Sequence, residues 1–244
     1  MSVHFSYFSR NNTLLSGSFT NTGRAPYTQL YFGASLDTIR DSAYSRFIFD
    51  LDLTLLRSKI TDGTISTTCS SAMTHTLRMV NTSFFEEELK NTPTSNGRMR
   101  ATSFDLILFR IPYANSESQT PQEWDEGVGY DFADLIYEFK DADKSFSDRP
   151  SNWFKTTTIN NWTQEGIYNN KNNGVVNYSA LTIVDTQHFE FGDENISFDM
   201  TDEINNILNG SLINTTGWGI AYLPQVENLT GLTQPYEVQF FTRH

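Results

Sequence analysis

Carboxylates gather around one tryptophan near the middle of the chain. Glu123, Asp125 and Glu126 flank Trp124 in a stretch that is punctuated by glycine. Cleavage of a glycosidic bond requires two carboxyl groups, and an aromatic ring beside them can serve as a platform for the sugar. Glu123 and Glu126 are therefore candidates for glycoside hydrolysis. Acids that adjoin one another on a loop are more often surface charge or a calcium site, so this enzyme hypothesis ranks below the non-catalytic ones.

Other reactive groupings have less support. Oxygen ligands for calcium occur at Asp193, Glu194 and Asn195, but without the alternating acidic spacing of a calcium-binding loop. The four histidines are scattered, and none has the companion at i+2 or i+4 that zinc sites use. Serine nucleophile elbows, phosphate-binding loops and dinucleotide fingerprints do not occur in the sequence. We therefore expect no enzymatic activity, no catalytic residue, no metal ligand and no cofactor.

Three tryptophans are the residues most suited to binding. Trp124, Trp153 and Trp162 could line a carbohydrate groove, since aromatic rings stack on sugar faces. Large rings also serve as anchors in a core or in a subunit interface. With 19 Phe and 11 Tyr in the chain, the core or interface role is the preferred interpretation. Glycan contact through these three residues remains the alternative.

Composition narrows the classes of partner. The formal net charge of −12 and the pI near 4.7 disfavour direct binding to nucleic acid, because that affinity comes largely from clustered Lys and Arg. A single cysteine, Cys69, excludes an internal disulfide. The first residues lack the pattern of a secretion signal, and no apolar run is long enough to cross a bilayer. We expect a soluble protein that is made in a cytosol and has no membrane partner.

Alternating hydrophobicity predicts the elements that must position these residues. Arg46–Leu53 places Phe47 and Phe49 on one side and charged residues on the other, as in a half-buried strand, and Phe104–Ile111 is apolar on both faces, as in a central strand. A short helix follows Asp199, and a second is expected over Phe132–Phe139, with an edge strand as its alternative. Further strands are predicted at Thr74–Val80, Thr156–Ile159, Val175–Ile183, His188–Phe191, Ile196–Phe198, Trp218–Leu223 and Val238–Thr242.

Many short strands separated by turn residues favour a sandwich. The predicted fold is all-β, an antiparallel β-sandwich (jelly roll) with one or two short helices. Residues 1–36 mix Ser, Asn, Thr and Gly with scattered aromatics and are predicted to form an extended N-terminal arm. Residues 37–244 are predicted to form one jelly-roll domain.

Several short motifs resemble those of a known family. They are Ser45–Leu51, Trp124–Gly127, Trp162 with Gly166, Phe198–Thr201 and Gly217–Ile220. Through them, about the last four fifths of the chain resembles the DNRLRE family of jelly-roll modules, with Met200 in place of the usual valine and long insertions between the motifs. This resemblance implies a β-sandwich of the carbohydrate-binding-module type.

The chain is also similar in character to virion proteins of tailed phages, particularly crAss-like phages, which use such sandwiches in the rings around their tails. The resemblance implies a structural virion protein, a jelly-roll subunit of a tail, collar or ring that is assembled in the host cytoplasm. Its expected partners are copies of itself and other virion structural proteins. The alternative is a carbohydrate-binding module in an adhesin or host-attachment protein.

Overall fold

Strands dominate the computed structural model, as the alternating sequence pattern predicts. The structure describes residues 4–17, 21–33, 43–65, 73–82, 99–127, 151–168, 181–212, 215–227 and 235–242. Within these ranges the elements are β1 (Phe8–Leu15), β2 (Tyr27–Gly33), β3 (Ala43–Leu51), α1 (Thr54–Thr61), β4 (Thr76–Met79), β5 (Met99–Arg100), β6 (Phe104–Arg110), β7 (Thr182–Phe189), β8 (Ile196–Asp199), α3 (Thr201–Leu208), β9 (Trp218–Tyr222), α4 (Pro224–Glu227) and β10 (Pro235–Phe241).

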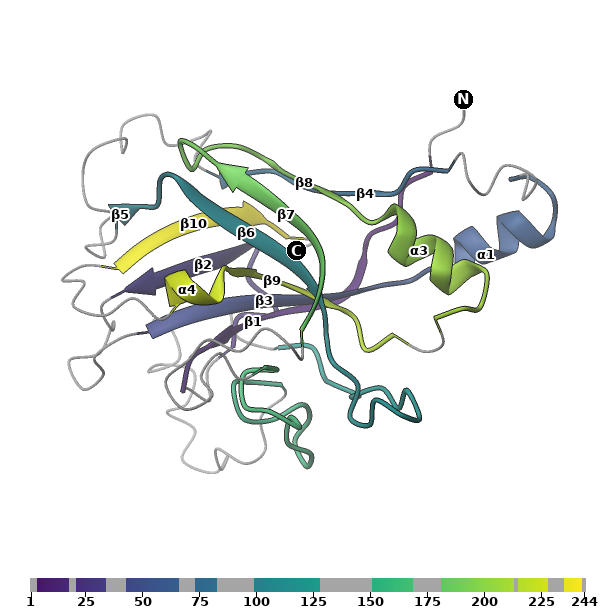
Figure 1. Ribbon diagram of the computed structural model, residues 1–244, viewed down its shortest axis with the longest axis horizontal. Coiled ribbons are helices and arrows are strands. Elements are labelled where there is room, and N and C mark those ends of the chain that lie inside the picture. Colours follow the sequence, from purple (N-terminus) through teal and green to yellow (C-terminus); the bar gives the residue numbers. More distant parts are fainter. Residues whose placement is uncertain are drawn as a thin grey trace.

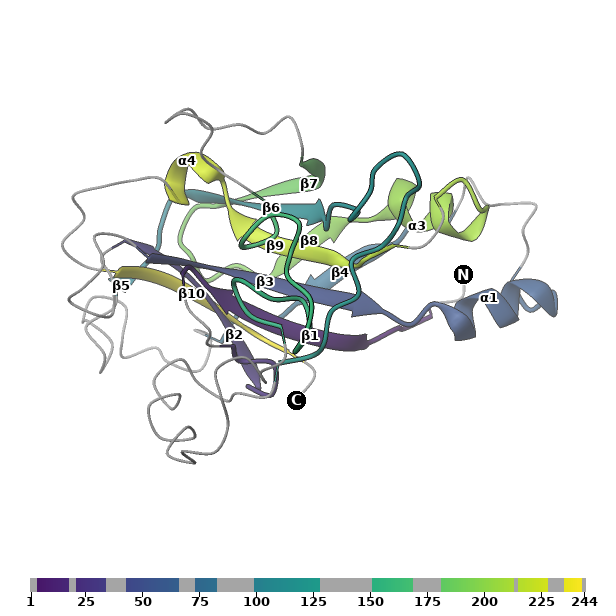
Figure 2. The same cartoon turned by 90° about the horizontal axis from the view of Figure 1, so that it is seen from below.

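The strands form a β-sandwich, which confirms the predicted fold class. The larger sheet has the order β5-β10-β2-β3-β9-β6-β7, with β1 also paired to β3, and a second sheet contains β4 and β8. All pairings are antiparallel except that of β5 with β10. Strand β3 pairs with β9 only over Phe47–Phe49, and the large sheet turns at this point. Figure 2 shows β6, β7 and β9 in one layer and β1, β2, β3 and β10 in the other.

The main core lies between the two layers. It contains Phe47 and Phe49 of β3 together with Leu106 and Leu108 of β6, all fully buried. The Phe47 and Phe49 rings stack with centroids 5.8 Å apart. Full burial of one such side chain stabilises the fold by about 1.5 to 3 kcal/mol, so the stacked Phe47 and Phe49 rings are a main source of stability. These residues alternate along their strands as predicted.

A second core covers the outer face of the same strands. Ile48 of β3 and Ile107 and Phe109 of β6 point away from the main core and are fully buried. The loop segment 151–168 lies over them. Gly219 of β9 is required here, because a side chain at this position would overlap the Phe109 ring. The half-buried strand predicted over Arg46–Leu53 is therefore wrong in one respect: both faces of β3 are covered between Arg46 and Phe49.

The N-terminal region differs from the extended arm expected for residues 1–36. Residues 8–15 and 27–33 of this region form β1 and β2, and β1 pairs with β3 from Phe8 to Leu15. Leu14 and Leu30 are fully buried, and the buried Asn12 amide donates to Ser151 O at 2.8 Å. The reason is polar burial. The Asn11 and Asn12 amides donate to the carbonyls of Gly23 and Ser151, and the Thr13 and Thr28 hydroxyls pair with each other, so the polarity of this region does not indicate exposure.

Most of the other predicted strands are confirmed. Strands β4, β6, β8, β9 and β10 overlap the strands predicted at Thr74–Val80, Phe104–Ile111, Ile196–Phe198, Trp218–Leu223 and Val238–Thr242, respectively. Strand β7 runs without a break to Phe189, so it joins parts of two predicted strands, while residues 175–180 of the first lie outside the described residues. The strand predicted over Thr156–Ile159 is wrong, since 151–168 contains turns and one isolated bridge between Lys155 and Asn161. The helix expected over Phe132–Phe139 also lies outside the described residues.

Helix α3 confirms the one helix predicted with clear periodicity. Ile204 and Ile207 are buried against the main core, and the Asp199 carboxylate accepts the Thr201 N–H at 2.8 Å at the helix start. The same helix buries Glu203, whose two carboxylate oxygens accept hydrogen bonds from Arg110 of β6 at 2.6 and 2.8 Å. This bidentate pair fixes α3 to the sheet.

Helix α1 projects from the sandwich. Figures 1 and 2 place it at one end of the long axis of the molecule. Among its described side chains Leu56 is buried, and most of the others are exposed or half-buried. His4 lies beside it, with Nδ1 3.4 Å from Lys59 Nζ, so residues 4–7 and α1 occupy the same end. The sequence analysis did not predict this helix, because its apolar face is short.

Hydrogen bonds from side chains of β7 to the backbone of β8 hold these two strands side by side. Asp185 Oδ2 accepts the Asp199 N–H at 2.7 Å, and Gln187 Oε1 accepts the Ser197 N–H at 2.7 Å. Gln187 Nε2 also donates to Asn195 O at 2.9 Å. These contacts take the place of a backbone ladder and attach the small β4-β8 sheet to the edge of the large one.

Candidate functional site

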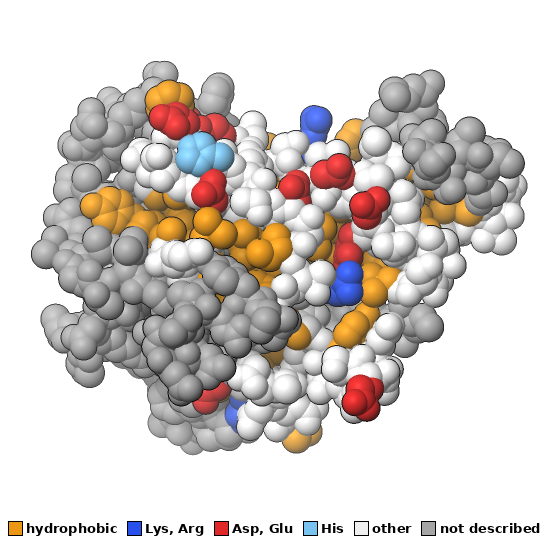
Figure 3. Space-filling model, viewed as in Figure 1, with side chains coloured by type: hydrophobic (Ala, Val, Ile, Leu, Met, Phe, Trp, Pro, Cys, Tyr) orange, Lys and Arg blue, Asp and Glu red, His pale blue; other side chains and the backbone are white. Residues whose placement is uncertain are grey.

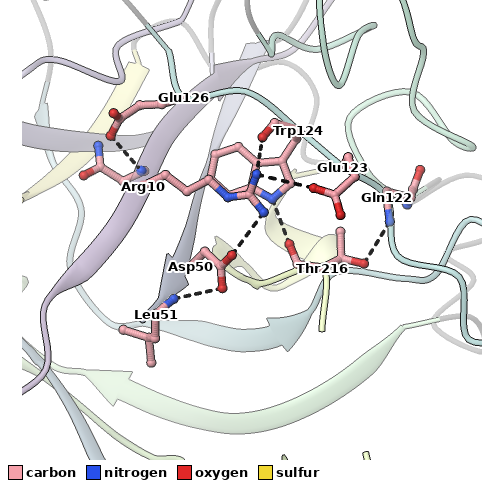
Figure 4. Close-up of polar contacts among 9 residues, drawn as sticks. Arg10, Asp50, Leu51, Gln122, Glu123, Trp124, Glu126 and Thr216 are labelled. Carbon is pink, nitrogen blue, oxygen red and sulfur yellow. Dashed lines mark hydrogen bonds and ion pairs between the residues drawn. The ribbon is translucent and has the colours of Figure 1, made fainter. Parts of the chain in front are cut away.

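The first candidate site is centred on Trp124 and Arg10. The Trp124 ring is 1% exposed, and its Nε1 donates to Thr216 O at 2.8 Å. The Arg10 guanidinium of β1 lies over the ring, 4.4 Å from its centroid, and also donates to the Trp124 carbonyl. Figure 4 shows this stack at the centre of a set of polar contacts. The arrangement joins the loop 121–127 to β1 by a cation–π contact and hydrogen bonds.

Arg10 is further oriented by acidic neighbours. Its Nη2 lies 3.0 Å from Asp50 Oδ2 of β3, and its Nη1 lies 3.9 Å from Glu123 Oε2. The other Asp50 oxygen accepts the Leu51 N–H at 2.9 Å. The guanidinium contacts two other segments, β3 and the loop 121–127, and so holds strand and loop together.

The structure separates the two carboxylates that were candidates for glycoside hydrolysis. Glu123 is exposed, with 76% of its side chain accessible, while Glu126 Oε1 accepts the backbone N–H of Asn11 at 3.0 Å. Figure 4 shows the two acids on opposite sides of the Arg10 and Trp124 stack. A glycosidase requires both carboxyl groups to face the same bond. The described geometry instead gives Glu126 a structural contact at the outer edge of β1.

A pair of variants tests this difference between neighbouring glutamates. Glu126→Ala removes the acceptor of the Asn11 N–H, and we expect the free energy of unfolding to fall by about 1 to 3 kcal/mol. Glu123→Ala, at an exposed position in the same loop, changes it by less than about 0.5 kcal/mol. Urea denaturation of both variants measures the values. Equal effects would show that the Asn11 contact is not significant.

The three tryptophans singled out in the sequence come together in the second core. Trp124, Trp153 and Trp162 are 1%, 6% and 5% exposed. Trp162 Nε1 donates to Asn152 O at 2.7 Å, and the Trp153 ring meets the Tyr44 ring edge-on at 5.2 Å. Their indoles therefore fill the space between the loop layer and the outer face of the sheet. Trp162 also borders a surface hollow.

The second candidate site is a buried arginine that sequence reasoning missed. Arg46 of β3 is fully buried and forms a two-point ion pair with Glu227 of α4, with distances of 2.9 Å from Nε to Oε1 and 2.7 Å from Nη2 to Oε2. Its Nη1 donates to the carbonyls of Gly166 and Tyr168. Its guanidinium carbon lies 3.5 Å from the Tyr168 ring centroid. Most of its donors are thus satisfied.

Electrostatics in this buried cluster favour one charge state. Burial alone lowers the pKa of Arg46, but the adjacent Glu227 carboxylate overrides it, and the net shift is upward. Burial, the largest influence, raises the pKa of the Tyr168 phenol. The phenol lies within 3.3 Å of Glu227 Oε1 and can donate to it while it stays protonated. A permanently charged arginine with most of its donors paired is suited to holding segments together and poorly suited to proton transfer.

The calcium candidates also have structural partners. Glu194 Oε1 accepts the backbone N–H groups of Glu190 and Phe191 at 2.8 and 2.9 Å, and Asn195 Oδ1 accepts that of Asn81 at 2.8 Å. Burial alone raises the pKa of Glu194, but these N–H donors outweigh it and the net shift is downward. In the part of the chain that the structure describes, no group of three or more His, Cys, Asp or Glu is arranged to hold a metal ion.

His188 provides a titratable group on the surface. Its Nδ1 lies 2.9 Å from Asp105 Oδ1 and its Nε2 lies 3.3 Å from Glu190 Oε2. The hydrogen bond with Asp105, followed by that with Glu190, raises the pKa of His188 above its ordinary value of 6.5.

We predict that an NMR titration of the His188 imidazole gives a pKa above 6.5 and that Asp105→Asn lowers it. Because the folded-state pKa is raised, the favourable contribution to stability is complete below pH 6.5 and disappears as pH rises through the folded-state value. A measured pKa at or below 6.5 in the unmodified protein would contradict the described contacts.

Comparison with known proteins gives no assignment. No protein-family model, no curated protein and no solved structure matches this chain.

None of the described helices has the length and apolar character that a membrane span requires.

Proposed function

We propose that the protein is a non-enzymatic structural subunit of a tailed-phage virion, located in a tail, collar or ring. In this role it contacts copies of itself and other virion proteins. Two features of the described side chains support this proposal. The buried charged residues fasten segments to one another, as Arg46 does with Glu227, while the large apolar side chains of Phe5, Tyr7 and Leu55 are exposed at one end.

The sequence supports the same proposal. The motif resemblance favours a jelly-roll module, and the acidic composition disfavours direct contact with nucleic acid. A β-sandwich is also compatible with many functions, so the fold by itself does not choose among them. Exposed large apolar side chains that gather at one end are typical of surfaces that contact another protein.

The test is to look for the protein in purified particles. Mass spectrometry of intact particles, with immunogold labelling by an antibody against the recombinant protein, should find it in multiple copies at one place in the tail region. A gene-neighbourhood map should place its gene among portal, capsid and tail genes. Absence from intact particles, with a gene in a polysaccharide-utilisation cluster, would overturn the proposal.

A carbohydrate-binding module is the second candidate, and one surface feature favours it. A hollow of about 470 Å³ lies beside Trp162, lined also by Phe154, Asn161, Thr163, Gln164 and Glu165. Two aromatic rings with amide and carboxylate groups around them are the groups that recognise sugars. Trp162 lines this hollow and is therefore the tryptophan that we propose for glycan contact.

A glycan array tests the second candidate. If the hollow binds sugar, Gln164→Ala and Asn161→Ala reduce binding at least tenfold without changing the thermal midpoint. Thr157→Ala, in the same segment but outside the hollow, serves as the control. An array without binding would rule the candidate out, as would binding that is unaffected by both substitutions.

A further inference from the structure

We infer that His75 is an acid-sensitive joint, at which protonation of the imidazole loosens the contact between strand β4 and helix α3. His75 directly precedes β4, and α3 begins beside it at Thr201. Such a pH response is a property of the fold itself. It goes beyond the proposed function and does not depend on it.

His75 is bonded to the start of α3 through both its backbone and its side chain. Its carbonyl accepts the Met200 N–H at 2.8 Å, and its own N–H donates to Thr201 Oγ1 at 3.0 Å. The side chain of Asn205, one turn further along α3, forms a hydrogen bond with the imidazole. The position of the ring is therefore coupled to the attachment of the helix.

The joint lies at the edge of the main core. The hydrogen bond from Met200 to His75 continues the β4-β8 ladder by one residue, so His75 shares a face of β4 with Leu77 and Met79. Both of these side chains are buried in the main core, to which α3 contributes Ile204 and Ile207. Loosening of the joint therefore gives water access to apolar side chains of the strand and the helix.

One nitrogen of the imidazole is poorly placed to carry a proton. His75 is half-buried, but its Nε2 is a buried atom, and among the described residues it has no hydrogen-bond partner. In the neutral ring this nitrogen can remain unprotonated. In the charged ring both nitrogens carry a proton, so Nε2 becomes a buried donor without an acceptor, which costs free energy. Burial is the largest influence on the pKa of His75 and lowers it.

The polar surroundings act in the opposite direction without prevailing. Asn205 and the Asp199 carboxylate each raise the pKa of His75, and the net shift is still downward from 6.5. Asp199 stays ionised at mildly acidic pH, because its own pKa is lowered, first by a hydrogen bond with the Thr201 side chain. Figure 3 shows acidic side chains along the face over β7, β8 and α3, with few basic side chains among them. The low pKa of His75 therefore comes from burial and not from nearby cations.

The other charged groups of the neighbouring elements have different positions. Asp202 of α3 is exposed, and Glu203 forms the ion pair with β6 described above. Arg78 of β4 is exposed on the face of the strand opposite to His75. Asp185 of β7 is bonded through Oδ2 to the backbone of β8. These groups leave burial as the main influence on the imidazole.

The sign of the pH dependence follows from the lowered pKa. The contribution of neutral His75 to stability is complete above pH 6.5 and is lost as pH falls from 6.5 through the folded-state value. His188 has the opposite dependence, because its pKa is raised. Ordinary carboxyl groups titrate near about pH 4, so the range from about pH 5 to about pH 7.5 reports mainly on the histidines.

Two measurements test the joint. An NMR titration should give His75 a pKa below 6.5, and Asn205→Ala should lower it further, because this hydrogen bond favours the charged ring. Hydrogen exchange, corrected for the intrinsic rate at each pH, should show less protection at about pH 5 than at about pH 7.5. We expect the protection of the His75 and Met200 amides to fall by roughly threefold or more. The Ala101 amide, which donates to Glu237 O outside the joint, should change less.

Two glutamine variants identify the responsible histidine. His75→Gln keeps a polar side chain that does not titrate, so the protection at Met200 should no longer fall in acid. His188→Gln is the matched control and should leave this fall intact. The inference is overturned if His75 titrates at or above pH 6.5, if protection falls equally at Met200 and Ala101, or if His75→Gln responds like the unmodified protein. Should His75→Gln fail to fold, an unchanged or raised pKa of His75 in Asn205→Ala would overturn it as well.

Discussion

Replacing Glu227 by alanine should lower the free energy of unfolding by about 3 to 5 kcal/mol. Arg46 would then keep a charge in a fully buried position without its carboxylate partner. Because its pKa is raised above the ordinary value, the guanidinium cannot escape the penalty by losing a proton. The Tyr168 hydroxyl would lose its acceptor in the same substitution. Urea denaturation at pH 7 measures the change.

A double-mutant cycle shows whether the pair is responsible. Arg46→Met should also be strongly destabilising, since it leaves the buried Glu227 carboxylate without its arginine partner. The double variant Arg46→Met/Glu227→Leu removes both charges, and we expect it to cost less than the sum of the two single changes. Arg110, which is less buried, forms the same kind of two-point ion pair with Glu203. We expect Arg110→Met to lower the free energy of unfolding by less than Arg46→Met does. Additive effects at Arg46 and Glu227 would contradict a coupled pair.

This ion pair also explains part of what sequence reasoning could not reach. The alternation of Phe47 and Phe49 correctly predicted β3 and the side that faces the main core. It placed Arg46 with the solvent-facing residues, because a lone strand gives no information about a second covering layer. Ile48 was the available signal, since it shares a face with Arg46 and would be exposed on a half-buried strand.

Buried polar side chains explain why the strands of the N-terminal region were not predicted. Asn11, Asn12 and Thr13 are buried in β1, each with a polar partner such as Gly23 O for the Asn11 amide. Hydrophobic periodicity detects strands that bury apolar residues and is silent on strands whose buried side chains are amides and hydroxyls. In contrast, α3 was predictable because Ile204 and Ile207 lie on one face of a helix with polar residues around them.

The candidate site shows a further limit of sequence reasoning. Sequence proximity joined Glu123, Trp124 and Glu126, but it could not show that their side chains diverge around Arg10. Arg10 comes from a segment more than a hundred residues away, and its position follows from the pairing of β1 with β3. Residue type gave the correct groups, while the direction of each side chain depended on tertiary contacts.

Trp124→Ala should lower the free energy of unfolding by about 3 to 5 kcal/mol, because it leaves a cavity where a fully buried indole was packed. The substitution also removes the surface over which Arg10 lies and the donor to Thr216 O.

Trp124→Phe separates these contributions, since it keeps much of the packing and leaves the Thr216 carbonyl without its indole donor. We expect a smaller loss of about 1 to 3 kcal/mol for this variant. Ile159→Ala, at an exposed position of the loop segment, should stay within about 0.5 kcal/mol. Thermal and urea unfolding of the three variants give the ranking. If Trp124→Ala unfolded like the unmodified protein, the ring would not be a core anchor, and its role would have to lie in contact with another molecule.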